Sequence, residues 1–221
     1  MQGFPRGVLF DLDGTLVDSA PDFVATIAVM AERRGLPAIA LQQLRPHVSK
    51  GSRAMLQASF PHVPDAERET WVPEFLATYE DVLGEHAPPF ARIPEVLEAL
   101  DAADVPWGIV TNKPEYLAVQ VLDKLNWSSR SRVLIGGDTL AVRKPDPLPL
   151  LVAAERMGLM PTDVVYVGDD LRDIQAANAA SMRSIAALWG YRLADENPAE
   201  WNASVLMEDV ADMLDGTKWP R

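Results

Sequence analysis

The chain has 221 residues, of which 48% are hydrophobic, and it carries a formal net charge of −12. A surface with this excess of negative charge repels nucleic acid and anionic membranes, and the absence of cysteine excludes disulfides, thiol nucleophiles and cysteine-ligated metals. No signal peptide and no apolar run of the roughly 18 residues that a membrane helix needs is recognisable, so a cytoplasmic protein is expected.

The first predicted element is an apolar strand at residues 7–10, which ends in Asp11 and Asp13 with one residue between them. Alternate residues of a strand point the same way, so both carboxylates can reach one small volume as the chain turns at Gly14. Two carboxylates at such close range are stable together only with a cation or a proton beside them. This segment therefore predicts a metal site, an acid/base pair, or both.

Residues 19–83 come next, and apolar residues recur in them at helical spacing. The stretch is far too long for a single crossover between strands. We therefore expect an inserted helical cap domain at residues 17–85, with residues 1–16 and 86–221 forming one catalytic core. The proline-rich residues 87–90 are the expected return linker.

Beyond residue 90 the pattern alternates between buried strands and helices. Apolar runs that predict strands lie at residues 107–110, 133–135, 164–167 and 184–187, with a weaker one at 204–206. Helical patterns separate most of them, at residues 94–103, 115–125, 148–157 and 173–180. This alternation is typical of the α/β class, and it predicts a doubly wound, mostly parallel, Rossmann-like sheet.

Polar residues follow the predicted strands where they end. They are Thr111, Asn112 and Lys113 after the second strand, Lys144 after the third, and Asp169, Asp170 and Asp173 after the fourth. Ligands of doubly wound sheets bind at these carboxyl ends, so we expect all these side chains to share one face with Asp11 and Asp13. A dense carboxylate cluster favours a hard cation, and all-oxygen ligands suggest Mg²⁺. The lysine, the hydroxyl and nearby backbone N–H groups suit a phosphate.

Four short motifs carry a family resemblance. They comprise Asp11, Asp13, Gly14 and Thr15; Thr111 and Asn112; Lys144 and Pro145; and Gly168, Asp169, Asp170 and Asp173. In residues and order they resemble the haloacid dehalogenase superfamily, subfamily IA, over essentially the whole chain, including a helical cap inserted after the first motif. Further segments resemble phosphoglycolate phosphatases and a proteobacterial branch of them, some of whose members act on N-acetylmuramic acid 6-phosphate. These segments are residues 110–114, 137–140, 144–147, 167–174 and 189–191.

The resemblance implies a Mg²⁺-dependent phosphomonoesterase that acts on a small phosphorylated metabolite through an aspartyl-phosphate. In such an enzyme Asp11 attacks phosphorus, and Asp13 protonates the leaving oxygen and then activates water. Mg²⁺ is held by the Asp11 carboxylate, the Asp13 backbone carbonyl and Asp169. Asp173 supports these ligands without binding the ion itself. The substrate implied is 2-phosphoglycolate or a sugar phosphate such as N-acetylmuramate 6-phosphate.

The resemblance also implies roles for the remaining polar residues. Thr111 and Asn112 hold phosphoryl oxygens, and Lys144 offsets charge on the nucleophile and the phosphate. Related caps contact the leaving group with a loop that corresponds to residues 45–53, which makes Lys50 and Arg53 the expected specificity residues. Ser181 stands where a glycine commonly relieves a left-handed helix end, so local backbone strain is expected there.

Two alternatives stay open. A sugar phosphomutase shares all four motifs and differs in its cap, and a non-catalytic protein that binds phosphometabolites would be marked by a lost catalytic residue, although none is lost here. Asp13 argues against a dehalogenase, which resembles this group but has a non-acidic residue at that position. The expected oligomeric state is a monomer or a weak homodimer.

Overall fold

The computed structural model describes residues 3–221, and its core is a six-stranded sheet in the order β3-β2-β1-β4-β5-β6. Every neighbouring pair of strands is parallel, which confirms the predicted doubly wound fold. The strands are β1 (Gly7–Phe10), β2 (Trp107–Val110), β3 (Leu134–Ile135), β4 (Val164–Gly168), β5 (Arg183–Ala187) and β6 (Val205–Met207). All of their ends lie within one residue of the predicted ones.

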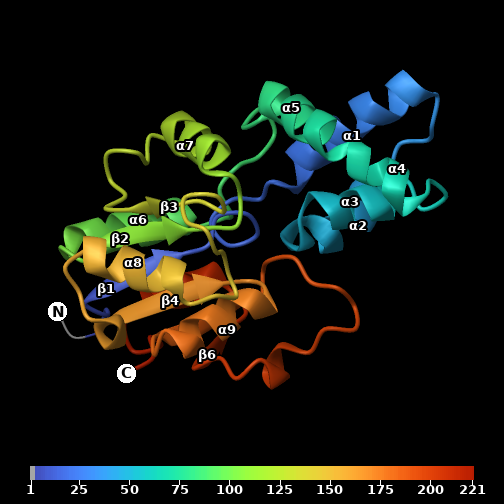
Figure 1. Ribbon diagram of the computed structural model, residues 1–221. Helices are drawn as coiled ribbons and strands as arrows, with labels where there is room; N and C mark the ends of the chain where they lie inside the picture. The colour runs from blue at the N-terminus through green and yellow to red at the C-terminus, as the bar shows by residue number, and fades with distance from the viewer. Residues whose placement is uncertain (1–2) are drawn as a thin grey trace.

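Helices cover both faces of this sheet (Figure 1). They are α6 (Ile93–Ala102), α7 (Glu115–Lys124), α8 (Leu148–Arg156) and α9 (Leu171–Ala179), with 3₁₀ turns η2 (Pro161–Asp163), η3 (Pro198–Glu200) and η4 (Val210–Leu214). On β1, Val8 and Phe10 pack into the apolar cluster that contains α6, whereas Leu9 packs with α8 and α9 on the opposite face. Both faces of the strand are therefore buried, which explains why its sequence is an unbroken apolar run and not an alternating one.

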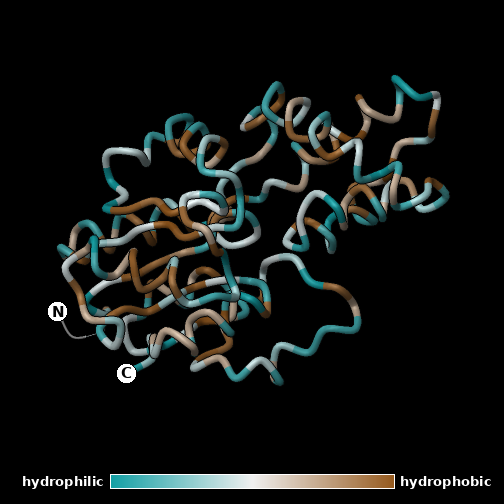
Figure 2. Tube along the Cα trace, in the orientation of Figure 1, coloured by the Kyte–Doolittle hydropathy of each residue, from teal (hydrophilic) through white to brown (hydrophobic). Residues whose placement is uncertain are grey.

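Figure 2 shows this burial by hydropathy, because the strands of the sheet are largely apolar and the hydrophilic segments lie mostly at the periphery.

Helix α9 begins two residues before the predicted start, because Asp170 caps it: the Asp170 carboxylate accepts a hydrogen bond from the backbone N–H of Arg172 at 3.0 Å. The sequence pattern alone marked only the apolar face of this helix.

A helical insertion, residues 20–82, separates β1 from α6 and lies beyond the sheet (Figure 1). It contains α1 (Ala20–Arg34), α2 (Leu41–Leu44), η1 (Arg45–Lys50), α3 (Ser52–Ser59), α4 (Asp65–Thr70) and α5 (Val72–Val82). Helices α1 and α5 are joined by aromatic packing, in which the Phe23 ring stacks on Tyr79 with centroids 4.3 Å apart. The insertion thus has apolar contacts of its own.

The chain leaves and re-enters the core at one place. The Asp18 N–H donates to the Pro88 carbonyl at 2.9 Å, and the Phe90 N–H donates to the Leu16 carbonyl at 3.0 Å. The predicted return segment 87–90 therefore runs beside the outgoing segment. Among residues 3–221, no helix has the length and apolar character needed to cross a membrane.

Ser181, just after α9, has a φ of 58°, the left-handed conformation that the sequence predicted. A side chain at such a φ is strained, so Ser181→Gly is expected to raise the free energy of unfolding by about 0.5–1 kcal/mol, after allowance for the greater freedom of glycine in the unfolded chain. Urea unfolding measures this change. Gly35→Ser, at the end of α1 where φ is 62°, is the matched reverse substitution and should lower stability. A destabilised Ser181→Gly variant would contradict the expectation.

Candidate active site

The candidate site lies where the sheet connections change direction, between β1 and β4. In a sheet of this order a crevice opens there, beyond the carboxyl ends of the strands. Strand β1 delivers Asp11 and Asp13, β4 delivers Asp169, and the neighbouring β2 delivers Thr111. The predicted convergence of strand ends is thus what the sheet order produces.

Three buried carboxylates form the centre of this site. One ligand atom from each of Asp11, Asp169 and Asp173 lies within 4.8 Å of the other two. Burial, followed by the charges of the other two acids, raises the pKa of Asp169 well above its ordinary value. Burial likewise raises the pKa of Asp173 to about 6, although the neighbouring Lys144 opposes the shift. Such a cluster favours a bound cation.

Lys144 supplies positive charge at the base of the cluster. Its Nζ lies 2.9 Å from Asp11 Oδ1 and 2.7 Å from Asp173 Oδ1, and it donates to the Tyr166 hydroxyl at 2.7 Å. Burial acts to lower the pKa of Lys144, but the two carboxylates outweigh it and raise that pKa, so the ammonium stays charged. Tyr166 in turn donates to the Val110 carbonyl at 2.7 Å, which ties the lysine to two strands.

Asp169 is fixed by donors from three separate segments. Thr15 Oγ1 donates to it at 3.1 Å, Ser49 Oγ at 2.8 Å, and the Tyr191 backbone N–H at 2.9 Å. Gly14 makes room for this arrangement, because its φ is 90° and a Cβ there would lie 2.2 Å from Asp169 Oδ2. The turn after β1 therefore requires glycine, both for its conformation and for the approach of the acid.

Thr111 and Asn112 lie on the other side of the cluster, at the end of β2. Thr111 is buried, and its Oγ1 accepts a hydrogen bond from the Lys113 backbone N–H at 3.2 Å, so the hydroxyl keeps its own proton for a ligand. The Asn112 side-chain N–H donates to the Lys144 carbonyl at 3.0 Å. Asn112 thereby ties the end of β2 to the loop that carries Lys144.

Sequence reasoning assigned no role to Lys113, yet its Nζ donates to both carboxylate oxygens of Asp13, at 3.1 and 3.2 Å. Its place in the polar triplet after the second strand was the available signal. Tyr166 and Tyr191 were also missed, since each reads in the sequence as an apolar or loop residue. Asp170, the neighbour of Asp169 in the fourth motif, is buried and caps α9.

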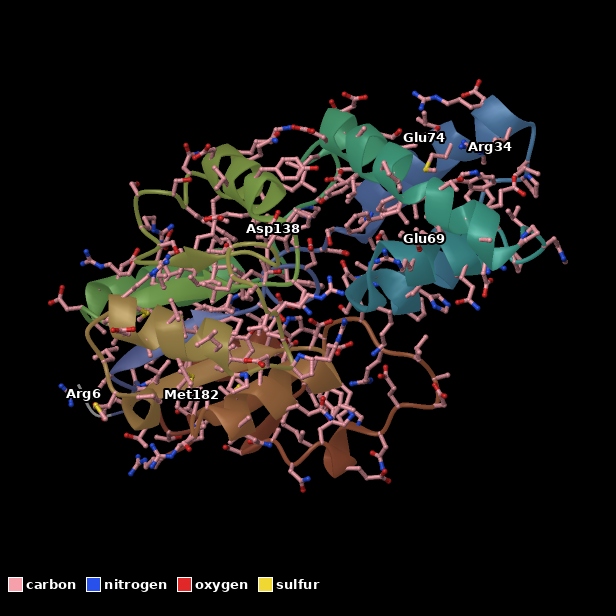
Figure 3. The ribbon with its side chains drawn as sticks, viewed as in Figure 1. Arg6, Arg34, Glu69, Glu74, Asp138 and Met182 are labelled. Atoms are coloured by element: carbon pink, nitrogen blue, oxygen red, sulfur yellow. The ribbon has the colours of Figure 1, made fainter. Side chains whose placement is uncertain are left out.

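A cavity of about 320 Å³ is lined by Asp11, Asp13 and Asp173 of the core and by residues of the helical insertion. Lys50 and Arg53 lie along its insertion side, and both are already paired with acids. Lys50 Nζ binds Asp170 at 2.7 Å and also Glu196, whereas Arg53 Nε binds Glu69 at 2.7 Å. Figure 3 labels Glu69 on the insertion. The cavity is thus bounded by the core cluster on one side and by the loop around η1 on the other.

Comparisons with known proteins agree along the whole chain. The haloacid dehalogenase-like hydrolase family model matches residues 8–187. A phosphoglycolate phosphatase of Xanthomonas campestris pv. campestris is 59% identical over 99% of each chain. An N-acetylmuramic acid 6-phosphate phosphatase of Pseudomonas aeruginosa is 41% identical over 95% of this chain and 93% of that one. The crystal structure of a predicted phosphoglycolate phosphatase from Haemophilus somnus matches with a TM-score of 0.83 at 26% identity, over 95% of this chain and 96% of that one.

Proposed function

Since the chain belongs to the haloacid dehalogenase-like hydrolases, we propose that it hydrolyses small phosphate monoesters, using Mg²⁺ and an aspartyl-phosphate formed on Asp11. The observation that carries this proposal is the placement of Asp11, which touches the charged Lys144 and lies within the carboxylate cluster beside the cavity. Family membership agrees with the resemblance drawn from the four motifs.

The donor set fits Mg²⁺, because three buried carboxylates offer only oxygen atoms. The single positive charge of Lys144 is too little to balance all three acids. In this proposal the Asp11 carboxylate, the Asp13 backbone carbonyl and Asp169 hold the ion, and Asp173 supports them through Lys144. When bound, the ion offsets the negative charge of the nucleophile and the phosphate, which otherwise repel each other.

Hydrolysis then takes two steps on residues of this chain. An Asp11 oxygen attacks phosphorus, the bond from phosphorus to the leaving oxygen breaks, and Asp13 donates its proton to that oxygen. Asp13 next removes a proton from water, which attacks phosphorus and releases inorganic phosphate and free Asp11. Thr111 and Asn112 orient phosphoryl oxygens, and Lys144 keeps the nucleophile in line.

We further propose that residues 17–85 act as a cap whose loop around η1 faces the leaving group. Lys50 and Arg53 line the cavity, which supports their assignment as specificity residues, although each must exchange its present acidic partner for substrate. The two candidate substrates are 2-phosphoglycolate and N-acetylmuramate 6-phosphate, as the names of the relatives suggest. A screen of phosphorylated metabolites separates them by kcat/KM.

Hydrolysis is favoured over phosphoryl transfer between sugars because relatives named as phosphatases match over 99% of the chain. A purely binding protein is disfavoured because polar residues from each of the four motifs line the cavity. The monomer or weak homodimer and the cytoplasmic location stay predictions.

Release of p-nitrophenol from p-nitrophenyl phosphate tests the proposed function. Activity is expected with Mg²⁺, and chelation by EDTA should lower it by about 100-fold or more, since the ion offsets charge that one lysine cannot balance alone. Added Mg²⁺ should restore it. Equal rates with and without EDTA would contradict the metal assignment, and no turnover of any phosphomonoester would contradict the enzyme itself.

A further inference from the structure

We propose that Lys113 is a positioning residue through which the helical insertion sets the orientation of Asp13. Tyr79 of the insertion holds Lys113, and Lys113 holds Asp13. The inference rests on the proposed function, in which Asp13 is the acid that protonates the leaving group. It adds a dependence of that acid on two residues outside the four motifs.

The contacts of Lys113 account for its whole ammonium group. Besides the two bonds to Asp13, its Nζ donates to the Tyr79 hydroxyl at 2.5 Å. An ammonium has three N–H donors, so these partners use them all. The Lys113 side chain is only 3% exposed, and a buried charge that loses a partner is strongly destabilised. The position of the Lys113 ammonium is therefore fixed by its contacts with Asp13 and Tyr79.

The insertion encloses this ammonium from one side. Lys113 Nζ lies 4.3 Å from the centroid of the Tyr79 ring and 5.2 Å from that of Phe23, within the range of cation–π attraction. The two rings come from α5 and α1 and stack on each other, whereas Lys113 and Asp13 belong to the core. The position of the ammonium thus depends on the insertion lying against the core.

Asp13 is the residue for which this dependence matters. Its side chain is 17% exposed beside the cavity, and Lys113 donates to both of its carboxylate oxygens. One oxygen gives up this contact when it carries the proton to the leaving group, and the other stays anchored on Lys113. Proton transfer needs a separation near a hydrogen-bond length, and a misplacement of about 1 Å can cost on the order of 100-fold in rate. An insertion that swings away would release Lys113 and leave the acid unaligned, so protonation of the leaving group is tied to a closed cavity.

The test compares two esters that differ in their need for an acid. The p-nitrophenolate ion departs without a proton, whereas the alkoxide of benzyl phosphate requires one from Asp13. The ratio kcat/KM reports only the steps through departure of the leaving group, so the later role of Asp13 with water does not enter. Both esters carry a single aromatic ring, so differences in binding are small.

Tyr79→Phe is the decisive variant, because it keeps the ring that stacks on Phe23 and removes only the oxygen that holds Lys113. We expect kcat/KM for benzyl phosphate to fall by about tenfold or more, and that for p-nitrophenyl phosphate by less than about twofold. Lys113→Met should show the same selective loss more strongly, and Lys113→Arg should recover part of it.

Lys124→Met is the matched control. Lys124 of α7 also reaches from the core toward the insertion, where it donates to the carbonyl of Leu83 at the end of α5, but it does not contact Asp13. This variant should change both esters equally. An equal loss of both esters in Tyr79→Phe, or no loss in either, would overturn the proposal. A wild-type protein that hydrolyses neither ester would instead contradict the proposed function.

Discussion

Replacing Asp11 with asparagine is expected to lower kcat for p-nitrophenyl phosphate by about 10⁴-fold or more while leaving the protein folded. The amide is a poor nucleophile, and the residue is proposed to form the bond to phosphorus. Asparagine has nearly the same shape, and its carbonyl oxygen can keep the contact with Lys144, which lies 2.9 Å from Asp11 Oδ1. Steady-state kinetics measures the loss, and thermal unfolding monitored by circular dichroism measures the fold.

Two further variants make this result specific. Asp81→Asn changes the charge by the same amount on the exposed surface of α5, and it should keep the wild-type rate. Asp11→Ala should match Asp11→Asn, which excludes activity from slow deamidation of the asparagine. Residual turnover above about 1% in both Asp11 variants would remove Asp11 as the nucleophile, because loss of a covalent nucleophile leaves far less than this.

The fold could be predicted well because its signals are local. Buried parallel strands are short apolar runs, and the ranges 7–10 and 107–110 coincide with β1 and β2. The helix starts were less accurate where a cap and not an apolar face sets the start, as with Asp170 at α9. The five α-helices of the insertion were predicted only as a helical stretch, since short amphipathic helices joined by tight turns blur into one periodic pattern.

The carboxylate cluster was also predictable, because parallel strands deliver their carboxyl ends to one edge and the acids follow those ends directly. The contacts of Lys113 were not, since its partners Asp13 and Tyr79 lie 100 and 34 residues away along the chain. Tyr166 was hidden for another reason. It lies within an apolar strand, so the sequence pattern indicates a core residue, yet its hydroxyl accepts the hydrogen bond from Lys144.

Asp169→Asn is expected to have opposite effects on activity and on stability. Activity should fall by more than about 100-fold, since even the partners of metal ligands cost 10–100-fold when removed. The melting temperature of the metal-free protein should rise by a few degrees, at about 2–4 °C per kcal/mol for a chain of this length. The reason is that asparagine is neutral without taking up a proton beside the other two acids, and it can still accept hydrogen bonds from Ser49 and the Tyr191 N–H.

The pH dependence follows from the direction of the pKa shifts. Asp169 and Asp173 both have raised pKa values in the folded protein, that of Asp173 moving from 3.8 to about 6. A raised folded-state pKa stabilises the fold at low pH, and this contribution is lost as pH rises through the folded value. The metal-free wild type should therefore lose stability relative to Asp169→Asn as pH increases from about 4 to 7.

Differential scanning calorimetry in EDTA at a series of pH values measures this gap, with Asp81→Asn as the control that should follow the wild type. Adding Mg²⁺ should close the gap, because an ion that binds only the folded wild type stabilises it by mass action and has one ligand fewer in Asp169→Asn. A gap that stays constant with pH would show that the acids do not repel one another. A gap that Mg²⁺ leaves unchanged would mean that Asp169 is not a ligand. The three acids would then be held together by Lys144 and the hydroxyl donors, without a metal ion.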